Sequence, residues 1–296
     1  MKFQFVAISL LLLSCQVNKK ETFDLQGHRG ARGMYPENSI PGFIYAIEQG
    51  STTIELDLAV SKDNQLVVSH DPYMSGTFCL DPAGNEIPDS VQRSHNIYQM
   101  TYEEVRSYDC GSKPHPGFPE QKKMATYRPL FSEMIDSVEN YLKKNELPPV
   151  NYNVEIKSSE KTDNTYHPTP DVFSDMVVEL VSNKLDLSRV NIQSFDFRVV
   201  RYLHENYPDV RLALLIGNDL GLQTNLDSLG FTPDIYSCHF SLVSQELVDK
   251  CHEMGMKVIP WTINDVEGMK KMVDFGVDGL ITDYPNKFTD EVRPGM

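Results

Sequence analysis

The sequence has little positive charge, and this limits the partners that it can bind. It carries 27 Lys and Arg residues against 42 Asp and Glu residues, a formal net charge of −15, and its isoelectric point is near 4.9. Nucleic acids are bound by basic surfaces that displace counterions from phosphates, so no nucleic-acid partner is expected. The acidic balance also disfavours tight docking on an anionic membrane, but it permits one phosphodiester bound by a few local cations.

The sequence also lacks an apolar run long enough to cross a bilayer, for which about 20 residues are needed. An apolar stretch, 3–13, follows Lys2 and ends in Leu12-Leu13-Ser14-Cys15 before a polar segment. This pattern is typical of a signal peptide. Its ending resembles a bacterial lipoprotein box, which implies cleavage before Cys15 and acylation of that thiol; an ordinary signal peptide is the alternative.

We therefore expect a signal peptide at 1–14 and a linker at 15–22. They would place an exported, lipid-anchored protein in the bacterial cell envelope, periplasmic or associated with the outer membrane, with the anchor as its only membrane contact.

Cysteine is scarce, and the five cysteines do not have the spacing of metal ligands, so zinc is not expected. Cys79 and Cys110 lie in a loop-rich stretch and could form a disulfide, a bond that persists in exported proteins. Cys238 and Cys251 lie in apolar periodic segments, where buried free thiols are common.

From residue 23 onward, short β-like runs alternate with segments of helical apolar spacing. The predicted strands are 23–27, 53–58, 151–156, 189–193, 211–216, 235–238, 257–261 and 279–281. The predicted helices are 39–49, 130–144, 170–184, 197–205, 220–229, 243–253 and 266–275. Such alternation indicates an α/β fold with a parallel sheet covered by helices.

One further run, 66–69, decides how the strands are counted. The polar turn between it and the second strand is too short for a helical crossover, so the run should return as an antiparallel hairpin. The other strands then number eight and predict a TIM (β/α)8 barrel as a single domain, 23–296, with a doubly wound open sheet as the alternative. A stretch rich in Pro and Gly, 72–129, is an insertion after the second strand, where it is expected to shape substrate access.

Four polar motifs lie at the ends of predicted strands. They are His28-Arg29-Gly30, Glu55-Leu56-Asp57, His70-Asp71 and Glu155-Ile156-Lys157. The carboxyl ends of parallel strands meet at one mouth, and strand residues two apart share a face, so these side chains should converge. Glu55, Asp57 and Glu155 would repel one another when buried, which predicts a bound cation. Carboxylate oxygens suit one hard divalent ion, Ca²⁺ or Mg²⁺.

The other groups in these motifs suit chemistry on a phosphate ester. Arg29 offers a planar fork for phosphate oxygens, and Lys157 adds a compact positive charge. His28 and His70 suit a reaction that removes one proton and delivers another near neutral pH, and the sequence does not assign either part.

The ordered set of motifs resembles the glycerophosphodiester phosphodiesterases. The resemblance extends from about residue 26 to 286 and includes Pro36-Glu37-Asn38-Ser39, Trp261-Thr262-Ile263-Asn264 and the segment 276–285. It implies a TIM barrel that hydrolyses small-molecule glycerophosphodiesters to sn-glycerol 3-phosphate and an alcohol. The resemblance also implies His28 and His70 as the acid/base pair, and Glu55, Asp57 and Glu155 as the metal ligands.

The resemblance further implies that the glycerol 2-hydroxyl attacks phosphorus to form a cyclic phosphate, with direct attack by water as the competing route. Two other functions stay open. One is a phospholipase or phosphodiester lyase on the same barrel, and the other is a non-catalytic lipoprotein that binds phosphodiesters.

Three residues near the motifs have two interpretations each. Glu37 is expected to orient Arg29 or a histidine, or else to favour a helix start. Gln193 could bond to the metal ligands or fill the barrel mouth. Trp261, the one tryptophan, could pack against the glycerol carbons or cap the core.

Overall fold

The computed structural model describes residues 23–293, so the expected signal peptide, Cys15 and the linker lie outside the described residues. The strands are β1 (Asp24–Gly27), β2 (Thr53–Val60), β3 (Leu66–Val68), β4 (Asn151–Ile156), β5 (Val190–Ser194), β6 (Arg211–Ile216), β7 (Ile235–Cys238), β8 (Lys257–Val258) and β9 (Gly279–Thr282). All belong to one sheet, in the order β8-β7-β6-β5-β4-β2-β1-β9, and β3 pairs with β2 outside this path.

The sheet is a nearly closed parallel barrel. Neighbouring strands along the path pair in parallel, whereas β3 pairs antiparallel with β2. Backbone hydrogen bonds from Asp278 N to Val258 O (3.0 Å) and from Ile281 N to Pro260 O (2.9 Å) join the last two strands. The predicted eight-stranded barrel and its hairpin are therefore confirmed.

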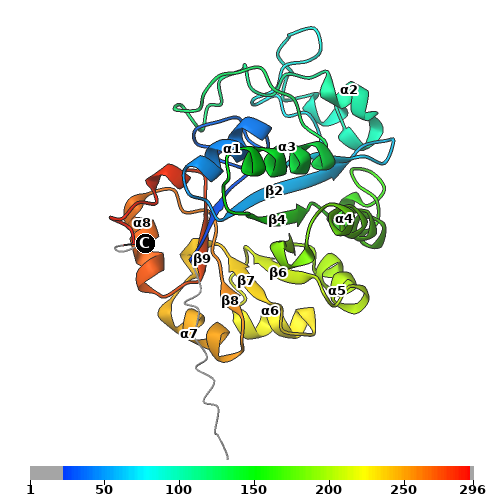
Figure 1. Cartoon of the computed structure of the whole chain (residues 1–296). Coiled ribbons are helices and arrows are strands. Elements are labelled where there is room, and N and C mark those ends of the chain that lie inside the picture. The colour runs from blue at the N-terminus through cyan, green and yellow to red at the C-terminus, as the bar shows by residue number, and fades with distance from the viewer. Residues whose placement is uncertain (1–22, 294–296) are drawn as a thin grey trace, which may run out of the picture.

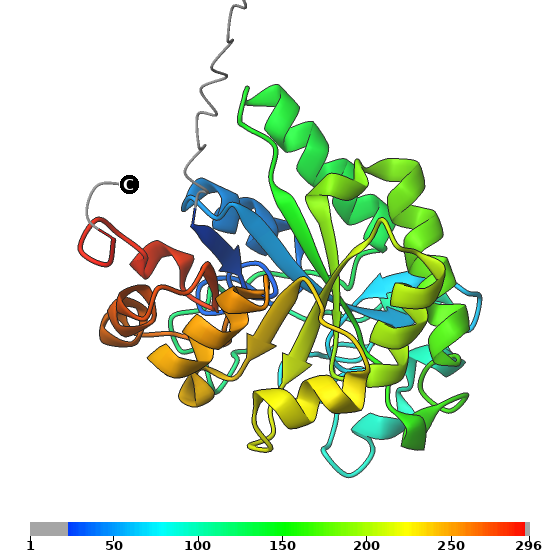
Figure 2. The same ribbon diagram turned by 90° about the horizontal axis from the view of Figure 1, so that it is seen from below.

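Helices surround the strands (Figure 1), and the view turned by 90° shows the same arrangement (Figure 2). They are α1 (Ile40–Glu48), α2 (Tyr102–Arg106), α3 (Phe131–Lys144), α4 (Pro170–Lys184), α5 (Phe197–Asn206), α6 (Leu222–Leu229), α7 (Gln245–Glu253) and α8 (Val266–Asp274). The seven predicted helices are all present, with ends that differ by at most two residues; α2, inside the insertion, was not predicted. No helix within residues 23–293 is long and apolar enough to span a bilayer.

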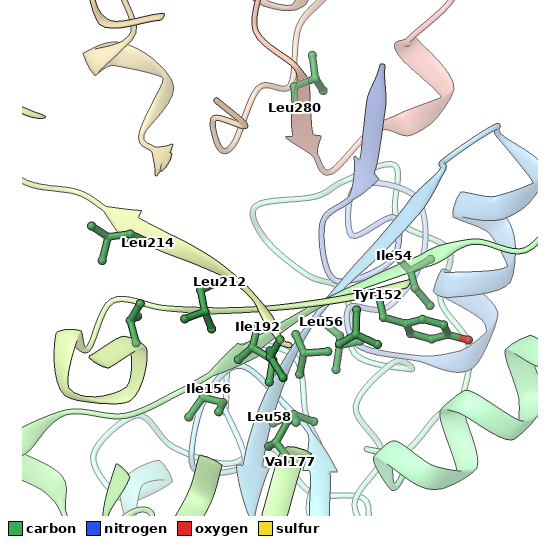
Figure 3. Packing of buried hydrophobic residues seen from close by; sticks show 14 of the residues in the cluster. Ile54, Leu56, Leu58, Tyr152, Ile156, Val177, Ile192, Leu212, Leu214 and Leu280 are labelled. Carbon is green, nitrogen blue, oxygen red and sulfur yellow. The ribbon is translucent and has the colours of Figure 1, made fainter. Parts of the chain in front are cut away.

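Alternation along β2 divides its side chains between two layers. Ile54, Leu56 and Leu58 are fully buried and belong to the main apolar cluster, in which Val177 of α4 also lies (Figure 3). Because successive strand side chains point to opposite faces, the intervening Glu55 and Asp57 point into the barrel.

The strand predicted at 257–261 is shorter in the structure and ends at Val258. Pro260 explains the difference, because proline has no N–H to donate to a ladder. The chain beyond it still lies beside β9, since Ile263 N donates to Ile281 O at 3.0 Å.

The insertion is not a loose surface excursion. It forms a second apolar cluster that includes Phe78, Ile97 and Tyr108 and packs on Ala59 of β2 and Val67 of β3. A disulfide joins Cys79 and Cys110, as the sequence suggested. Cys238 and Cys251 are buried free thiols, also as expected.

Candidate active site

Three buried carboxylates meet at the mouth of the barrel. Glu55, Asp57 and Glu155 are 1%, 0% and 6% exposed, and each offers one oxygen within 4.8 Å of the others. Their approach follows from strand register, because Asp57 of β2 lies directly beside Glu155 of β4. The predicted convergence of these three side chains is therefore present.

The carboxylate cluster has a donor set that fits a hard divalent cation. Glu55 accepts hydrogen bonds from Arg29 N at 2.8 Å and from Gln193 Nε2 at 2.9 Å, and Glu155 Oε1 accepts one from Lys157 Nζ at 2.7 Å. Asp57 Oδ1, however, is buried and accepts no hydrogen bond from residues 23–293, although Lys157 Nζ lies 3.6 Å from it. A buried carboxylate oxygen without a donor is costly, and a cation among the three carboxylates would satisfy it.

Burial and mutual repulsion act differently on the three carboxyl groups. Burial raises the pKa of Glu55 well above its usual range, and the charges of Asp57 and Glu155 raise it further. Burial also raises the pKa of Glu155, against the opposing effect of Lys157. For Asp57 the effect of burial is outweighed by Arg29 together with His70, Lys157 and the hydrogen bond from Asn38, so its pKa lies well below the usual range. Without a cation, full ionisation of the cluster is therefore unfavourable.

The turn after β1 presents Arg29 to this cluster. Arg29 and Gly30 have φ angles of 50° and 87°, in the left-handed region. A Cβ at Gly30 would lie 2.7 Å from the carbonyl carbon of Gly42, so only glycine fits there. The Arg29 guanidinium donates to Glu37 Oε2 at 3.1 Å, and its Nε lies 3.4 Å from Asp57 Oδ2.

Glu37 contacts Arg29 and also binds a basic residue that sequence reasoning missed. Arg128, at the end of the insertion, is 2% exposed and donates to the Glu37 carbonyl oxygen at 2.6 Å and to Glu37 Oε1 at 3.4 Å. Burial by itself would raise the pKa of the Glu37 carboxyl. The charges of the neighbouring arginines outweigh this effect and lower the pKa. Through Arg128 the insertion thus supports the carboxylate that holds Arg29.

We expect Arg128→Met to lower the free energy of unfolding by about 1–3 kcal/mol, because it leaves buried oxygens of Glu37 without their donors. Urea unfolding measures this change. Arg106→Met, which removes an exposed cation lying 4.7 Å from the Tyr127 ring centroid, is the matched control and should stay within about 0.5 kcal/mol of the wild type. Equal effects of the two substitutions would contradict this role of Arg128.

Each of the two motif histidines is paired with a carboxylate through Nδ1. His28 Nδ1 lies 2.7 Å from Asp283 Oδ1, and His70 Nδ1 lies 2.9 Å from Asp71 Oδ1. Asp283 also accepts from Arg32 Nε at 2.8 Å. Such pairs fix the orientation of each ring and leave Nε2 available.

Burial lowers the pKa of His28 to about 4, although the Asp283 carboxylate raises it. The ring is therefore neutral above about pH 4 and gains its proton only below that pH. We expect Asp283→Asn to lower this pKa further, since the substitution removes the charge that favours the imidazolium. NMR titration of the His28 ring in the metal-free protein measures the shift; a higher pKa in the variant would contradict the assignment.

Sequence reasoning also missed amides that hold the carboxylates. Asn38 Nδ2 donates to Asp57 Oδ2 at 2.9 Å, and Asn153 Nδ2 donates to Gln193 Oε1 at 3.0 Å. The sequence did contain a signal for Asn38 and Asp283, because both lie inside motifs that carry the family resemblance. Asn153 had no such signal, because an amide inside a strand has no characteristic sequence pattern.

A cavity of about 190 Å³ opens at this end of the barrel. It is lined by His28, Arg29, Arg32, Glu55, His70, Glu155, Lys157, Gln193, Phe195, Leu215, Trp261, Thr262 and Ile281. Both histidines, both basic motif residues and Trp261 thus face one space. Glu37 and Asp57 lie behind the wall of the cavity, where they contact Arg29.

A parallel barrel whose mouth combines clustered carboxylates, paired histidines and basic side chains is a TIM-barrel enzyme. The sequence profile of the glycerophosphoryl diester phosphodiesterase family matches residues 28–287. The chain therefore belongs to the glycerophosphoryl diester phosphodiesterase family.

Known proteins agree with this membership. A glycerophosphodiester phosphodiesterase of Caldanaerobacter subterraneus is 29% identical, with 90% of this chain and 97% of the relative covered. A crystal structure from Silicibacter pomeroyi, named for the same activity, superposes with a TM-score of 0.81 at 25% identity, over 92% of this chain and 94% of that one. An Oleispira antarctica phosphodiesterase, solved with the product sn-glycerol-3-phosphate, has the same fold, with a TM-score of 0.71 at 22% identity over 91% and 96% of the two chains.

Proposed function

We propose that the protein hydrolyses glycerophosphodiesters to sn-glycerol 3-phosphate and an alcohol, with Ca²⁺ or Mg²⁺ held by Glu55, Asp57 and Glu155. The observation that carries this proposal is the buried carboxylate cluster, with its unbonded Asp57 oxygen, beside two basic residues and two histidines. The names of the relatives and the product bound to the Oleispira protein support the choice of substrate.

A bound divalent cation would polarise a phosphate oxygen and offset the charge that develops in the transition state. Lys157 and Arg29, which line the cavity, would bind the remaining phosphate oxygens. Trp261 donates its indole N–H to Ser237 O at 3.0 Å, so the ring is held in place to pack against the glycerol carbons.

We assign the first proton transfer to His28. Its neutral ring, backed by Asp283, is suited to take a proton from the glycerol 2-hydroxyl as that oxygen attacks phosphorus. His70 would then protonate the departing alkoxide. When water opens the cyclic phosphate, His70 would act as the base and His28 as the acid. Cyclic glycerophosphate among the products of a slow variant supports this route, whereas its absence at every stage favours direct attack by water.

The substrate class is tested by comparing glycerophosphocholine with an intact phospholipid such as phosphatidylcholine. We expect glycerol 3-phosphate from the deacylated diester and no reaction of the intact lipid. Release of a diacylglycerol product would instead favour a phospholipase on the same barrel.

We also propose that the chain is exported and anchored through an acylated Cys15. The Cys79–Cys110 disulfide supports an oxidising compartment. Mass spectrometry of the mature N-terminus tests the anchor: a lipid-modified Cys15 is expected, and an unmodified chain that begins after Cys15 would contradict it.

A further inference from the structure

A second cavity, of about 200 Å³, lies against the first. The two share His70, Glu155, Lys157 and Phe195 as common walls. The two histidines therefore differ in position. His28 lines only the first cavity, whereas His70 lines both. A diester whose phosphate lies at the shared wall would extend one ester arm into each cavity.

The second cavity is formed mainly by the segment that follows β4. Its further lining residues are Pro72, Ile156, Ser158, Ser159, Thr162 and His167. Only Pro72 comes from the insertion, which was expected to shape substrate access. The insertion contributes indirectly, since Asn96 Nδ2 donates to Thr165 O at 2.8 Å and so ties the two segments together.

The segment after β4 is held by a buried histidine. His167 is 3% exposed, its Nδ1 lies 2.8 Å from Pro168 O, and its Nε2 accepts from Ser159 N at 3.1 Å. Both ring nitrogens are therefore used, so His167 holds the segment in place and is not available as a free acid or base. The cavity wall is thus built before substrate arrives.

Glu155, which lines this cavity, and two nearby carboxylates are already paired with cations. Asp163 and Asp196 each lie 2.7 Å from a nitrogen of Arg198, and Glu155 is bonded to Lys157. Glu155 is the one carboxylate that lines the cavity, so a quaternary or primary ammonium group would find no uncommitted counter-charge among the lining residues. The hydroxyl of Ser159 is exposed and makes no hydrogen bond within residues 23–293, so it can bond to an incoming hydroxyl.

We propose that this second cavity, here called the alcohol cavity, binds the leaving alcohol and selects a small uncharged polyol, such as glycerol, over choline or ethanolamine. The inference rests on the proposed function, because it requires that the phosphate lies at the wall shared by the two cavities. Apolar Pro72 and Ile156 would contact the carbon chain, and the Ser159 hydroxyl would bond to a hydroxyl of the polyol. The Thr162 hydroxyl already contacts Ser159 O at 3.1 Å and His167 Nε2 at 2.9 Å, and its oxygen could accept one further hydrogen bond from the polyol.

The test compares diesters of glycerol phosphate with glycerol, choline and ethanolamine on the wild type and on two tyrosine variants. Ser159→Tyr fills the alcohol cavity, whereas Thr165→Tyr changes an exposed residue of the same segment that does not line it. We expect the wild type to favour the glycerol diester in kcat/KM by about tenfold or more, Ser159→Tyr to remove most of that preference, and Thr165→Tyr to keep it. Equal wild-type rates on the three diesters, or equal behaviour of both variants, would overturn the proposal.

A binding measurement separates this inference from the proposed function. Saturation-transfer NMR with Mg²⁺ and excess glycerol 3-phosphate should detect glycerol on the wild type and on Thr165→Tyr, but much less on Ser159→Tyr, and should not detect choline. If all three diesters resist hydrolysis, the proposed function fails while this pattern still supports the alcohol cavity. Choline signals as strong as those of glycerol would overturn the inference even in an active enzyme.

Discussion

Alanine in place of His28 or His70 is expected to lower kcat about 10²–10⁴-fold, the usual contribution of a general acid or base. Each ring is aligned by a carboxylate through Nδ1, at 2.7 Å for His28 and 2.9 Å for His70, and both line the cavity beside the carboxylate cluster. Because phosphate binding is assigned to Arg29 and Lys157 and not to either histidine, KM should change much less than kcat. Steady-state kinetics with a glycerophosphodiester measures both constants.

His204→Ala is the matched control, since that ring lies on α5, stacks on Phe231 and lines neither cavity. It should keep near wild-type activity. A substrate with a 4-nitrophenol leaving group separates the two histidines, because that leaving group departs without a proton. His70→Ala should then recover much of its rate and His28→Ala should not. Full activity of either alanine variant on the natural type of diester would remove the acid/base assignment.

Ca²⁺ or Mg²⁺ at about a hundredfold excess over its Kd is expected to stabilise the chelator-treated protein by about 2.7 kcal/mol. The corresponding rise in Tm is about 5 °C. The reason is the buried carboxylate cluster, in which Asp57 Oδ1 has no hydrogen-bond donor and the charges of Glu55 and Glu155 oppose each other. Thermal unfolding with each cation measures the shift without any assay of activity.

Glu155→Gln should gain little stability from added cation, because it removes one of the three carboxylate ligands. The comparison uses the cation-induced shift and not the stability of the chelated variant, since the substitution also removes the partner of Lys157. Glu205→Gln, an exposed change on α5, should behave like the wild type in both conditions. A cation-induced shift of the same size in Glu155→Gln would contradict the ligand role.

The period of two along strands was the strongest sequence signal, and it located the carboxylate cluster. Glu55 and Asp57 share a face because they are two residues apart, and parallel register brings Glu155 beside them. The tight turn after β2 likewise predicted the hairpin that carries His70. These features depend on local spacing and on the shared direction of parallel strands, both of which can be read along the chain.

Contacts between distant parts of the chain left no such pattern. Asp283 reaches His28 across 255 residues, and Arg128 reaches Glu37 from an irregular insertion across 91 residues. A single acidic or basic residue outside a periodic segment could lie at many places in the fold, so its contact partner cannot be read from the sequence. The alcohol cavity was hidden for the same reason, because its walls come from the segment after β4 and only Pro72 comes from the insertion.

The most direct test of the central claim is glycerol 3-phosphate release from a glycerophosphodiester by the protein after chelation, and again after Ca²⁺ or Mg²⁺ is restored. If Glu55, Asp57 and Glu155 hold the cation that the reaction needs, release should stop on chelation and return with the cation in the wild type, and should not return in Glu155→Gln. Undiminished release after exhaustive chelation would contradict the account.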